Sequence, residues 1–260
     1  ALLPNIANQM RSLLSNLYLA ASQVIPPEQR EQDPALDAKA AILEQSFFRL
    51  LRLVNSMSAA EYLSDSQTLS LRDADLVKLV SEVCESSADL AEQVGIQLKF
   101  VCAMDRRVCA IHPAAVEQML YHLLSNALKF TPAGGTVTVE LKKSGETLRL
   151  TVSDTGCGIP PERMAHLFDG CFQPGHPTPA PYGLGLGLSL CRAIAEKHGG
   201  SITVESAPGK GSRFMVSLPD RQLGSQLSDI PSVYNGGFSR PLLGLADALP
   251  SDAFAVRNLE

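Results

Sequence analysis

DTGCGIP at residues 154–160 and GLGLGLSL at residues 183–190 are the stretches that decide the fold of this chain of 260 residues. Both hold closely spaced glycines, which let the backbone approach a bound group without a Cβ clash. Two such turns on either side of a loop predict a pocket for a nucleotide. The alternating strand pattern before Asp154 places its carboxylate at a strand end, where it can accept a hydrogen bond from an adenine amine. Taken alone, this turn is equally compatible with a tight connection or an ion loop.

The second glycine stretch leads into a helical pattern. Gly183, Gly185 and Gly187 stand at its start, and unhindered N–H groups at a helix N-terminus form a site for a polyphosphate. The stretch is not a P-loop, because no Gly-Lys-Ser/Thr follows, and it lacks the βαβ surroundings of a dinucleotide site. A glycine run by itself is weak evidence, so its meaning depends on the segments around it.

A helical pattern over residues 113–130 supplies a further wall of the predicted pocket. Four side chains at steps of three and four share one face of this helix: His122, Asn126, Lys129 and Phe130. The amide oxygen of Asn126 can ligate Mg²⁺, Lys129 can meet phosphate charge, and Phe130 can cover the base or ribose. The alternative is an ordinary solvated helix face.

Residues 1–24 and 36–62 carry apolar side chains at steps of three and four, which predicts two helices with a narrow apolar seam. The seam consists of Ile6, Met10, Leu13, Leu17, Ala20 or Ala21 and Val24, then Leu43, Phe47, Leu50, Val54 and Met57. Prolines between residues 26 and 34 break the helical pattern. Because a lone hairpin buries little surface, we expect it to pair with a second copy into a four-helix bundle. Packing on the chain's own C-terminal domain is the alternative.

From residue 73 onward the pattern alternates between helix and strand periods. Helices are predicted at residues 73–95, 113–130, 161–167 and 186–198, and strands at 96–103, 108–111, 136–141, 147–153, 201–206 and 212–218. The predicted fold class is α+β, with the helical hairpin followed by an α/β sandwich, a mixed sheet with helices on one side. Predicted domains are residues 1–66, 67–218 and 219–260. The last has no assignable motif and is expected either to dock as a short strand and helix or to remain mobile.

Composition narrows the class of protein. The net charge of −5 and the pI near 5.6 argue against nucleic acid as a partner, since phosphate backbones are held by clustered Lys and Arg. No apolar run approaches the roughly 20 residues that cross a bilayer, so we expect a cytoplasmic protein, with any membrane or sensor segment preceding residue 1. The six cysteines show no paired metal spacing, which favours a reducing compartment.

The order of four blocks is more specific than any one of them: residues 117–132, 154–160, 168–172 and 183–190. They resemble the N, G1, F and G2 boxes of the histidine kinase catalytic domain in the GHKL ATP-binding superfamily. The resemblance implies that Asn126 is the Mg²⁺ ligand, that Asp154 contacts adenine, and that residues 171–182 form a lid over ATP. Two positions depart from the pattern, His122 where Asn is common and Cys171 where an aromatic is common. The implied site for ATP or ADP comprises His122, Asn126, Lys129, Phe130, Asp154, Gly156, Gly158, Ile159, Gly183, Leu184, Gly185, Leu186 and Gly187.

The N-terminal sequence NIANQMRSLL at residues 5–14 is similar to the H box of the same kinases. In that alignment Asn8 stands at the phosphoacceptor position and Gln9 at that of the neighbouring acid. The lone pair of a carboxamide nitrogen is delocalised into the carbonyl, so Asn8 is not a useful nucleophile. All five histidines lie at or after residue 112, so none replaces it. The alternative is that both are merely solvated helix residues.

These observations predict a dimeric ATP-binding member of a two-component system that does not autophosphorylate, a regulatory pseudokinase whose partner is a response regulator or another histidine kinase. A kinase that phosphorylates a histidine on a partner is one alternative. A weak ATPase is another, in which His122 serves as the general base one helical turn before Asn126. A scaffold with a dead pocket is the third.

Overall fold

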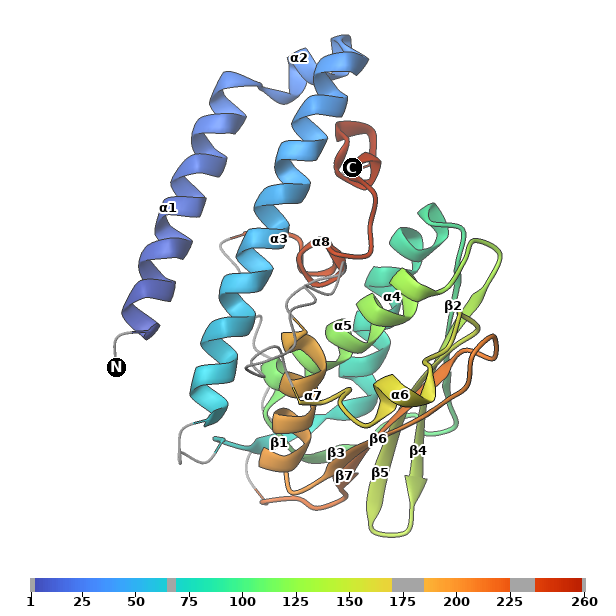
Figure 1. Ribbon diagram of the computed structural model, residues 1–260. Coiled ribbons are helices and arrows are strands. Elements are labelled where there is room, and N and C mark those ends of the chain that lie inside the picture. Colours follow the sequence, from blue (N-terminus) through green and yellow to red (C-terminus); the bar gives the residue numbers. More distant parts are fainter. Residues whose placement is uncertain (1–2, 65–68, 170–184, 225–236, 259–260) are drawn as a thin grey trace.

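The computed structural model describes residues 3–64, 69–169, 185–224 and 237–258. Two long helices, α1 (Leu3–Val24) and α3 (Pro34–Ser64), lie side by side and are joined through the short helix α2 (Pro27–Gln32), as Figure 1 shows. Pro27 begins α2, where its missing N–H costs no helical hydrogen bond, and Asp33 separates it from α3. None of the helices within the described ranges is long and apolar enough to cross a membrane.

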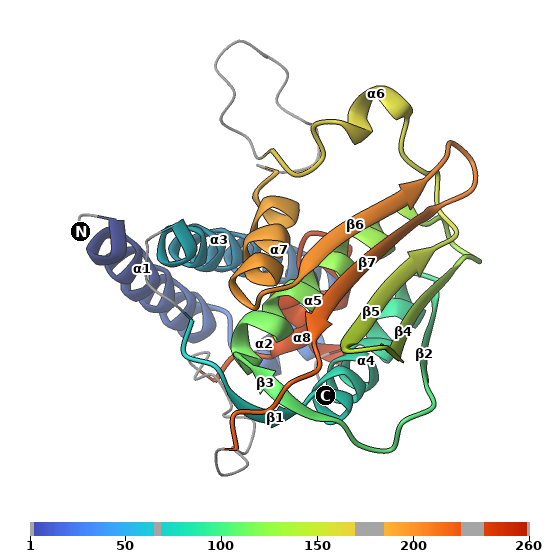
Figure 2. The ribbon, with the colours of Figure 1, turned by 90° about the horizontal axis from the view of Figure 1, so that it is seen from below.

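The second part of the chain is a mixed five-stranded sheet in the order β2-β4-β5-β7-β6. β2 and β4 are parallel, and the other pairs are antiparallel. Its strands are β2 (Gln97–Cys102), β4 (Thr136–Ser144), β5 (Thr147–Asp154), β6 (Ser201–Ser206) and β7 (Ser212–Pro219). Three helices cover one face of this sheet, as Figure 2 shows: α4 (Leu76–Gln93), α5 (Pro113–Phe130) and α7 (Leu186–Lys197). This arrangement confirms the predicted α+β fold with a mixed sheet covered on one side.

The core forms where alternate side chains of the central strands meet α5. Val139 pairs with Val152 across β4 and β5, and Val152 pairs with Phe214 across β5 and β7. Leu120 and Leu124 of α5 are completely buried beside this face. Burial of such side chains stabilises the fold by roughly 1.5–3 kcal/mol each. The outcome is a fixed spatial relation between the end of β5 and the end of α5.

Two boundaries differ from those predicted. The helix expected at residues 73–95 begins at Leu76, because β1 (Arg72–Asp75) pairs antiparallel with β3 (Val108–Ile111). The carboxylate of Asp75 accepts hydrogen bonds from the backbone N–H groups of Val77 and Lys78 and so caps α4. The sequence of β1, RDAD, is mostly charged and lacks the apolar residues that indicate a strand. The helix expected at residues 161–167 is α6 (Pro161–Met164).

The C-terminal residues that carried no motif are ordered where the structure describes them. They form α8 (Arg240–Leu245) and two 3₁₀ helices, η1 (Ser251–Phe254) and η2 (Val256–Asn258). Ser239 caps α8 through its hydroxyl, and Pro241 occupies the first turn. Of the two expected outcomes, docking occurs for residues 237–258, as short helices without a strand.

Candidate nucleotide site

Asp154 closes β5 and organises the loop that follows it. Its Oδ1 accepts hydrogen bonds from the N–H groups of Gly156 at 2.8 Å and Ser212 at 3.2 Å. Burial raises the pKa of Asp154, while these two N–H groups lower it, and the raising effect is the larger. Its other oxygen, Oδ2, receives no hydrogen bond from any residue that the structure describes. One carboxylate oxygen therefore holds the loop, and the second is available to accept from an amine of a ligand.

The glycines of the loop are required by the protein's own backbone. A Cβ on Gly156 would lie 2.3 Å from the carbonyl oxygen of Phe130. A Cβ on Gly158, whose φ is +70°, would lie 2.0 Å from the carbonyl oxygen of Ala207. The next residue, Ile159, donates its N–H to the hydroxyl of Ser206 at 2.8 Å. The loop is thus held between the end of α5 and the turn that joins β6 to β7.

Helix α5 meets this loop at its last residue, Phe130. The carbonyl of Phe130 accepts the N–H of Cys157 at 3.2 Å, which ties the helix end to the loop. Asn126 is partly buried, and its side chain makes no hydrogen bond to a described residue. The Lys129 ammonium lies 5.8 Å from the ring centroid of Phe130. Burial lowers the pKa of Lys129, and the charges of two arginines on α3 lower it further against the opposing effect of a nearby aspartate.

His122 lies one turn before Asn126 but faces α3 rather than solvent. It is 6% exposed. Its Nδ1 lies 3.1 Å from the guanidinium of Arg52, and its Nε2 lies 3.4 Å from the hydroxyl of Ser56. Burial and then the charge of Arg52 lower the pKa of His122 to about 3. The imidazole is therefore neutral at ordinary pH, and its two nitrogens are engaged by the N-terminal helices.

The second glycine stretch is described from Gly185 onward, so Gly183 and Leu184 lie outside the described residues, as do Cys171 and the expected lid at residues 171–182. Gly185 precedes α7 with a φ of +66°, which favours glycine, and the partly buried Leu186 begins the helix. A Cβ on Gly187 would lie 3.1 Å from Nδ1 of His122. This glycine therefore permits close packing of α7 on α5.

Asn8 and Gln9 lie on another part of the molecule, on α1, which Figure 1 shows on the side of α3 away from the sheet. Both side chains are exposed. The carboxamide oxygen of Asn8 accepts a hydrogen bond from Arg11, which also binds Asn55 at 3.0 Å and Ser58 at 2.7 Å on α3. The structure thus joins the end of α5 at Phe130 to the loop, and it keeps position 8 apart from them.

The donor set fits magnesium with an adenine nucleotide. Within the described ranges no three His, Cys, Asp or Glu side chains gather as a metal cage. Mg²⁺ commonly keeps few protein ligands and takes the rest from phosphates and water. Asn126 would supply such a ligand, and the unengaged oxygen of Asp154 would meet the adenine amine. The nucleotide and its metal would supply a transferable phosphoryl group, and the protein residues would orient it.

The sequence did not predict that Ser206, Ser212 and Arg52 contact the candidate loop and α5. Ser206 accepts from the loop, donates to the carbonyl of Gly211 at 2.8 Å and lies 3.0 Å from the Ser212 hydroxyl. The glycine turn at residues 209–211 was the available signal, because a Cβ on Gly211 would lie 1.9 Å from the carbonyl oxygen of Asp154. Nothing in the sequence pairs Arg52 with α5.

Comparison with known proteins agrees with this geometry. The family model of histidine kinase-, DNA gyrase B-, and HSP90-like ATPases matches residues 111–222. The circadian input-output histidine kinase CikA of Synechococcus elongatus is 34% identical over 190 residues, 72% of this chain and 25% of that protein. The sensor histidine kinase RppB of Synechocystis sp. is 30% identical over 217 residues, 83% of this chain and 48% of that protein. The chain spans about a quarter to a half of the length of these relatives.

Solved structures extend the likeness to the arrangement of the elements. Full-length ShkA in complex with AMPPNP aligns with a TM-score of 0.67 at 25% identity, over 86% of this chain and 46% of that one. The nucleotide-free catalytic domain of histidine kinase ThkA aligns with a TM-score of 0.52 at 25% identity, over 59% of this chain and 97% of that one. Residues 111–222 therefore form an ATPase domain of the histidine kinase-, DNA gyrase B- and HSP90-like family, of the kind found in sensor histidine kinases.

Proposed function

We propose that this chain binds Mg²⁺ with ATP or ADP in a two-component system and acts as a regulatory member that does not autophosphorylate at the usual position. The observation that carries the proposal is the organised Asp154 loop, in a chain whose exposed Asn8 stands where the resemblance to the H box puts the phosphoacceptor. A carboxamide nitrogen has no lone pair available for phosphoryl transfer. The ATPase domain would therefore sense or present nucleotide, and the face around Asn8 and Gln9 would dock a response regulator or another histidine kinase.

Each candidate residue has a role in this proposal. Asn126 ligates Mg²⁺, Lys129 and the glycine-rich start of α7 meet phosphate charge, and Phe130 and Ile159 line the base or ribose. Gly156 and Gly158 hold the loop in the shape that leaves the second oxygen of Asp154 open to adenine. Gly183 and Leu184 lie outside the described residues, and their contacts with phosphate are part of the proposal.

A homodimer through α1 and α3 is part of the proposal. The predicted seam on α1 is exposed in a single chain, with Leu13 at 62%, Leu17 at 66% and Val24 at 75%. On α3, Leu50 and Met57 are also at least 40% exposed. Two residues of the predicted seam, Phe47 and Val54, are instead buried within the chain at 6% and 1% exposure, and Phe47 packs on Tyr18 and Phe238. The apolar side chains that stay exposed on α1 and α3 are the surface that a second copy would cover to complete a four-helix bundle.

The ATPase alternative through His122 receives no support from the geometry. A general base needs access to a water molecule and a pKa near the working pH. The imidazole is buried against α3, and its pKa is lowered to about 3. We therefore assign His122 a packing role between α5 and α3.

Two measurements on the chain test the proposal. Calorimetric titration with a nonhydrolysable ATP analogue and Mg²⁺ should give one site, and incubation with γ-labelled ATP should leave residues 1–63 without acid-labile label. An acid-labile phosphoprotein in that region would refute the loss of autophosphorylation. Absence of both heat of binding and thermal stabilisation by nucleotide would refute the ATP site, because a ligand of the folded state must raise its apparent stability.

A further inference from the structure

Residues 237–258, here called the C-terminal clasp, lie along α3 and between the N-terminal helices and α5 (Figure 1). The clasp is part of the core, since Leu245 and Phe254 are completely buried. The ring of Phe238 lies 5.0 Å from that of Tyr18 on α1 and 5.1 Å from that of Phe47 on α3. Aromatic contacts of this kind bury large apolar areas with defined geometry.

Polar side chains on successive turns of α3 bind the clasp. The bonded pairs are Gln45 Nε2 with the Leu249 carbonyl (2.6 Å), Arg49 Nε with the Ala246 carbonyl (3.1 Å) and Arg52 with the Asp247 carboxylate (2.9 Å). Ala246 is the C-cap of α8, so the bond from Arg49 satisfies a carbonyl that has no partner within the helix. A polar face of α3 that would otherwise contact solvent therefore binds the clasp.

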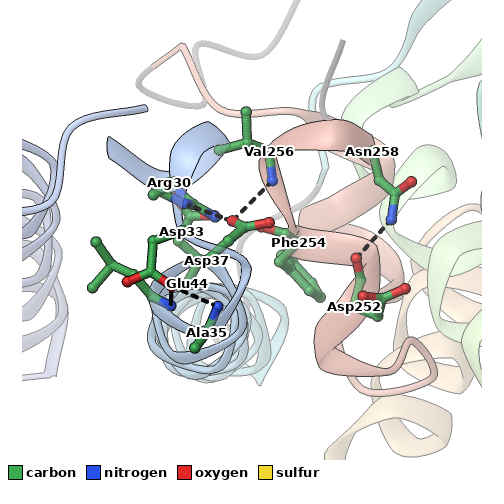
Figure 3. Close-up of polar contacts among 10 residues, drawn as sticks. Arg30, Asp33, Ala35, Asp37, Glu44, Asp252, Phe254, Val256 and Asn258 are labelled. Atoms are coloured by element: carbon green, nitrogen blue, oxygen red, sulfur yellow. Dashed lines mark hydrogen bonds and ion pairs between the residues drawn. The ribbon is translucent and has the colours of Figure 1, made fainter. Parts of the chain in front are cut away.

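A buried arginine fixes the far end of the clasp, as Figure 3 shows. Arg30 is 5% exposed, and its guanidinium binds Glu44 at 2.8 Å, Asp37 at 2.9 Å and the carbonyl of Phe254 at 2.9 Å. Asp37 also accepts the N–H of Val256 at 3.2 Å. Burial lowers the pKa of Arg30, but its bonds to Glu44 and Asp37 outweigh burial and raise it. Removal of one partner from a buried ion pair of this kind strongly destabilises the fold, because the remaining charge is left buried and unpaired.

The opposite side of the clasp rests on α5 of the ATPase domain. A Cβ on Gly244 would lie 2.4 Å from the ring of Tyr121, so α8 and α5 pack at the distance that only glycine permits. Arg240 and Glu117 form an ion pair at 3.1 Å across the same contact. The clasp therefore touches both parts of the molecule, with different residues for each.

We propose that residues 237–258 are an intramolecular clasp that holds the ATPase domain against α1–α3, so that release of the clasp loosens the domain from α3. Arg52 is its central contact, because it binds Asp247 of the clasp and also Ser125 of α5 at 2.9 Å. Ser125 precedes Asn126 in α5. Release of Asp247 from Arg52 would therefore alter the contact between Arg52 and Ser125, directly beside the proposed magnesium ligand. The expected effect of clasp release on nucleotide binding rests on the proposed function, whereas the clasp itself does not.

Hydrogen–deuterium exchange of the full chain without nucleotide tests the clasp. The variants are Gly244→Ala, which puts a methyl group against Tyr121, and Asp247→Ala, whose side chain is 46% exposed. Asp105→Ala, at an exposed acid in the connection between β2 and β3, is the matched control. Both clasp variants should speed exchange at least tenfold within residues 237–258, and the facing residues 45–52 should lose protection as well. Residues 136–154 of the sheet and the control variant should keep wild-type exchange.

Unchanged exchange of residues 237–258 in both variants would overturn the clasp. So would a parallel rise across residues 136–154, because that pattern reports unfolding of the whole molecule rather than release. Since no nucleotide is present, a chain that proves unable to bind ATP loses the proposed function without altering this result. Titration of Mg²⁺ with ADP into wild type and the two clasp variants then measures the coupling between clasp release and nucleotide binding. The affinity for ADP is expected to differ from wild type by at least threefold.

Discussion

At the scale of single residues, His122 shows how burial decides the role of a titratable group. Sequence spacing puts it on the same helix as Asn126 and one turn away. In the structure, Arg52 and Ser56 of α3 engage both its nitrogens, and its pKa is lowered to about 3. The residue thus joins α5 to α3 as a neutral acceptor for a buried guanidinium.

This burial predicts a pH-dependent stability. With a folded pKa of about 3 against 6.5 for a free imidazole, the unfolded chain binds a proton below pH 6.5 that the folded chain does not bind. The free energy of unfolding should therefore fall as pH drops from 6.5 towards 3, by up to about 1.4 kcal/mol for each pH unit from this group. Urea unfolding of wild type and His122→Gln between pH 4 and 7 measures the difference.

His122→Gln keeps a hydrogen-bond acceptor for Arg52, and its amide does not titrate, so the slope of its stability against pH should be shallower at low pH. A residual slope is expected, because burial also lowers the pKa of His112 and His198. Equal slopes for wild type and variant would mean that His122 is accessible to protons in the folded state.

Asp154 allows a second test at this scale. Asp154→Asn keeps an oxygen for the N–H groups of Gly156 and Ser212 but turns the second oxygen into a donor, which repels an adenine amine. Nucleotide affinity should fall about 10- to 100-fold, the usual effect of losing a hydrogen bond to a charged group. Calorimetry measures this, with Asp105→Asn as the control for the same change in charge. Wild-type affinity in Asp154→Asn would remove Asp154 from the site.

At the scale of elements, the loop after β5 is shaped by its fit against the β6–β7 turn. Gly158 and Gly209 both have positive φ, at +70° and +74°, yet only at Gly158 would an added Cβ meet another atom within 4 Å. The N–H of Gly209 donates to the carbonyl of Cys157 at 2.8 Å, so loop and turn are joined on both sides. Alanine at position 209 would therefore add backbone strain alone, whereas alanine at position 158 would add backbone strain and a steric clash.

Gly158→Ala should destabilise the protein by at least about 1–3 kcal/mol more than Gly209→Ala, because the left-handed conformation strains both variants and overpacking affects only the first. Chemical denaturation of the two variants gives the comparison. Similar losses in both would show that the loop moves away from Ala207 without cost, and the tight packing would not be what holds the loop.

At the scale of the whole molecule, the apolar face of α1 predicts association. Leu17→Glu should convert a dimer into a monomer with little effect on the fold, since this side chain is 66% exposed within one chain. Analytical ultracentrifugation measures the mass. Ser12→Glu, on another face of the same helix, is the matched control and should remain dimeric. A wild-type chain that sediments as a monomer at all concentrations would contradict the proposed bundle.

The spacing of apolar residues was sufficient to predict the helices and strands that have one clearly buried face. Helix α5 was predicted at its observed bounds, and the sheet strands were predicted to within a few residues, because apolar spacing reflects which face is buried. Glycine chemistry identified the loop after Asp154 for a different reason: only glycine tolerates the close backbone contacts at Gly156 and Gly158. What the sequence by itself determined was therefore the fold class and the place of the glycine loop at the end of β5.

The tertiary structure alone decided which faces meet. Nothing local indicates that Arg30, Gln45, Arg49 and Arg52 bind a segment some 200 residues later, or that β1 pairs with β3. The same holds for His122, whose neutral buried state depends on α3 packing over α5. Long-range burial sets charge state and partner choice, and it leaves no period in the sequence of either partner.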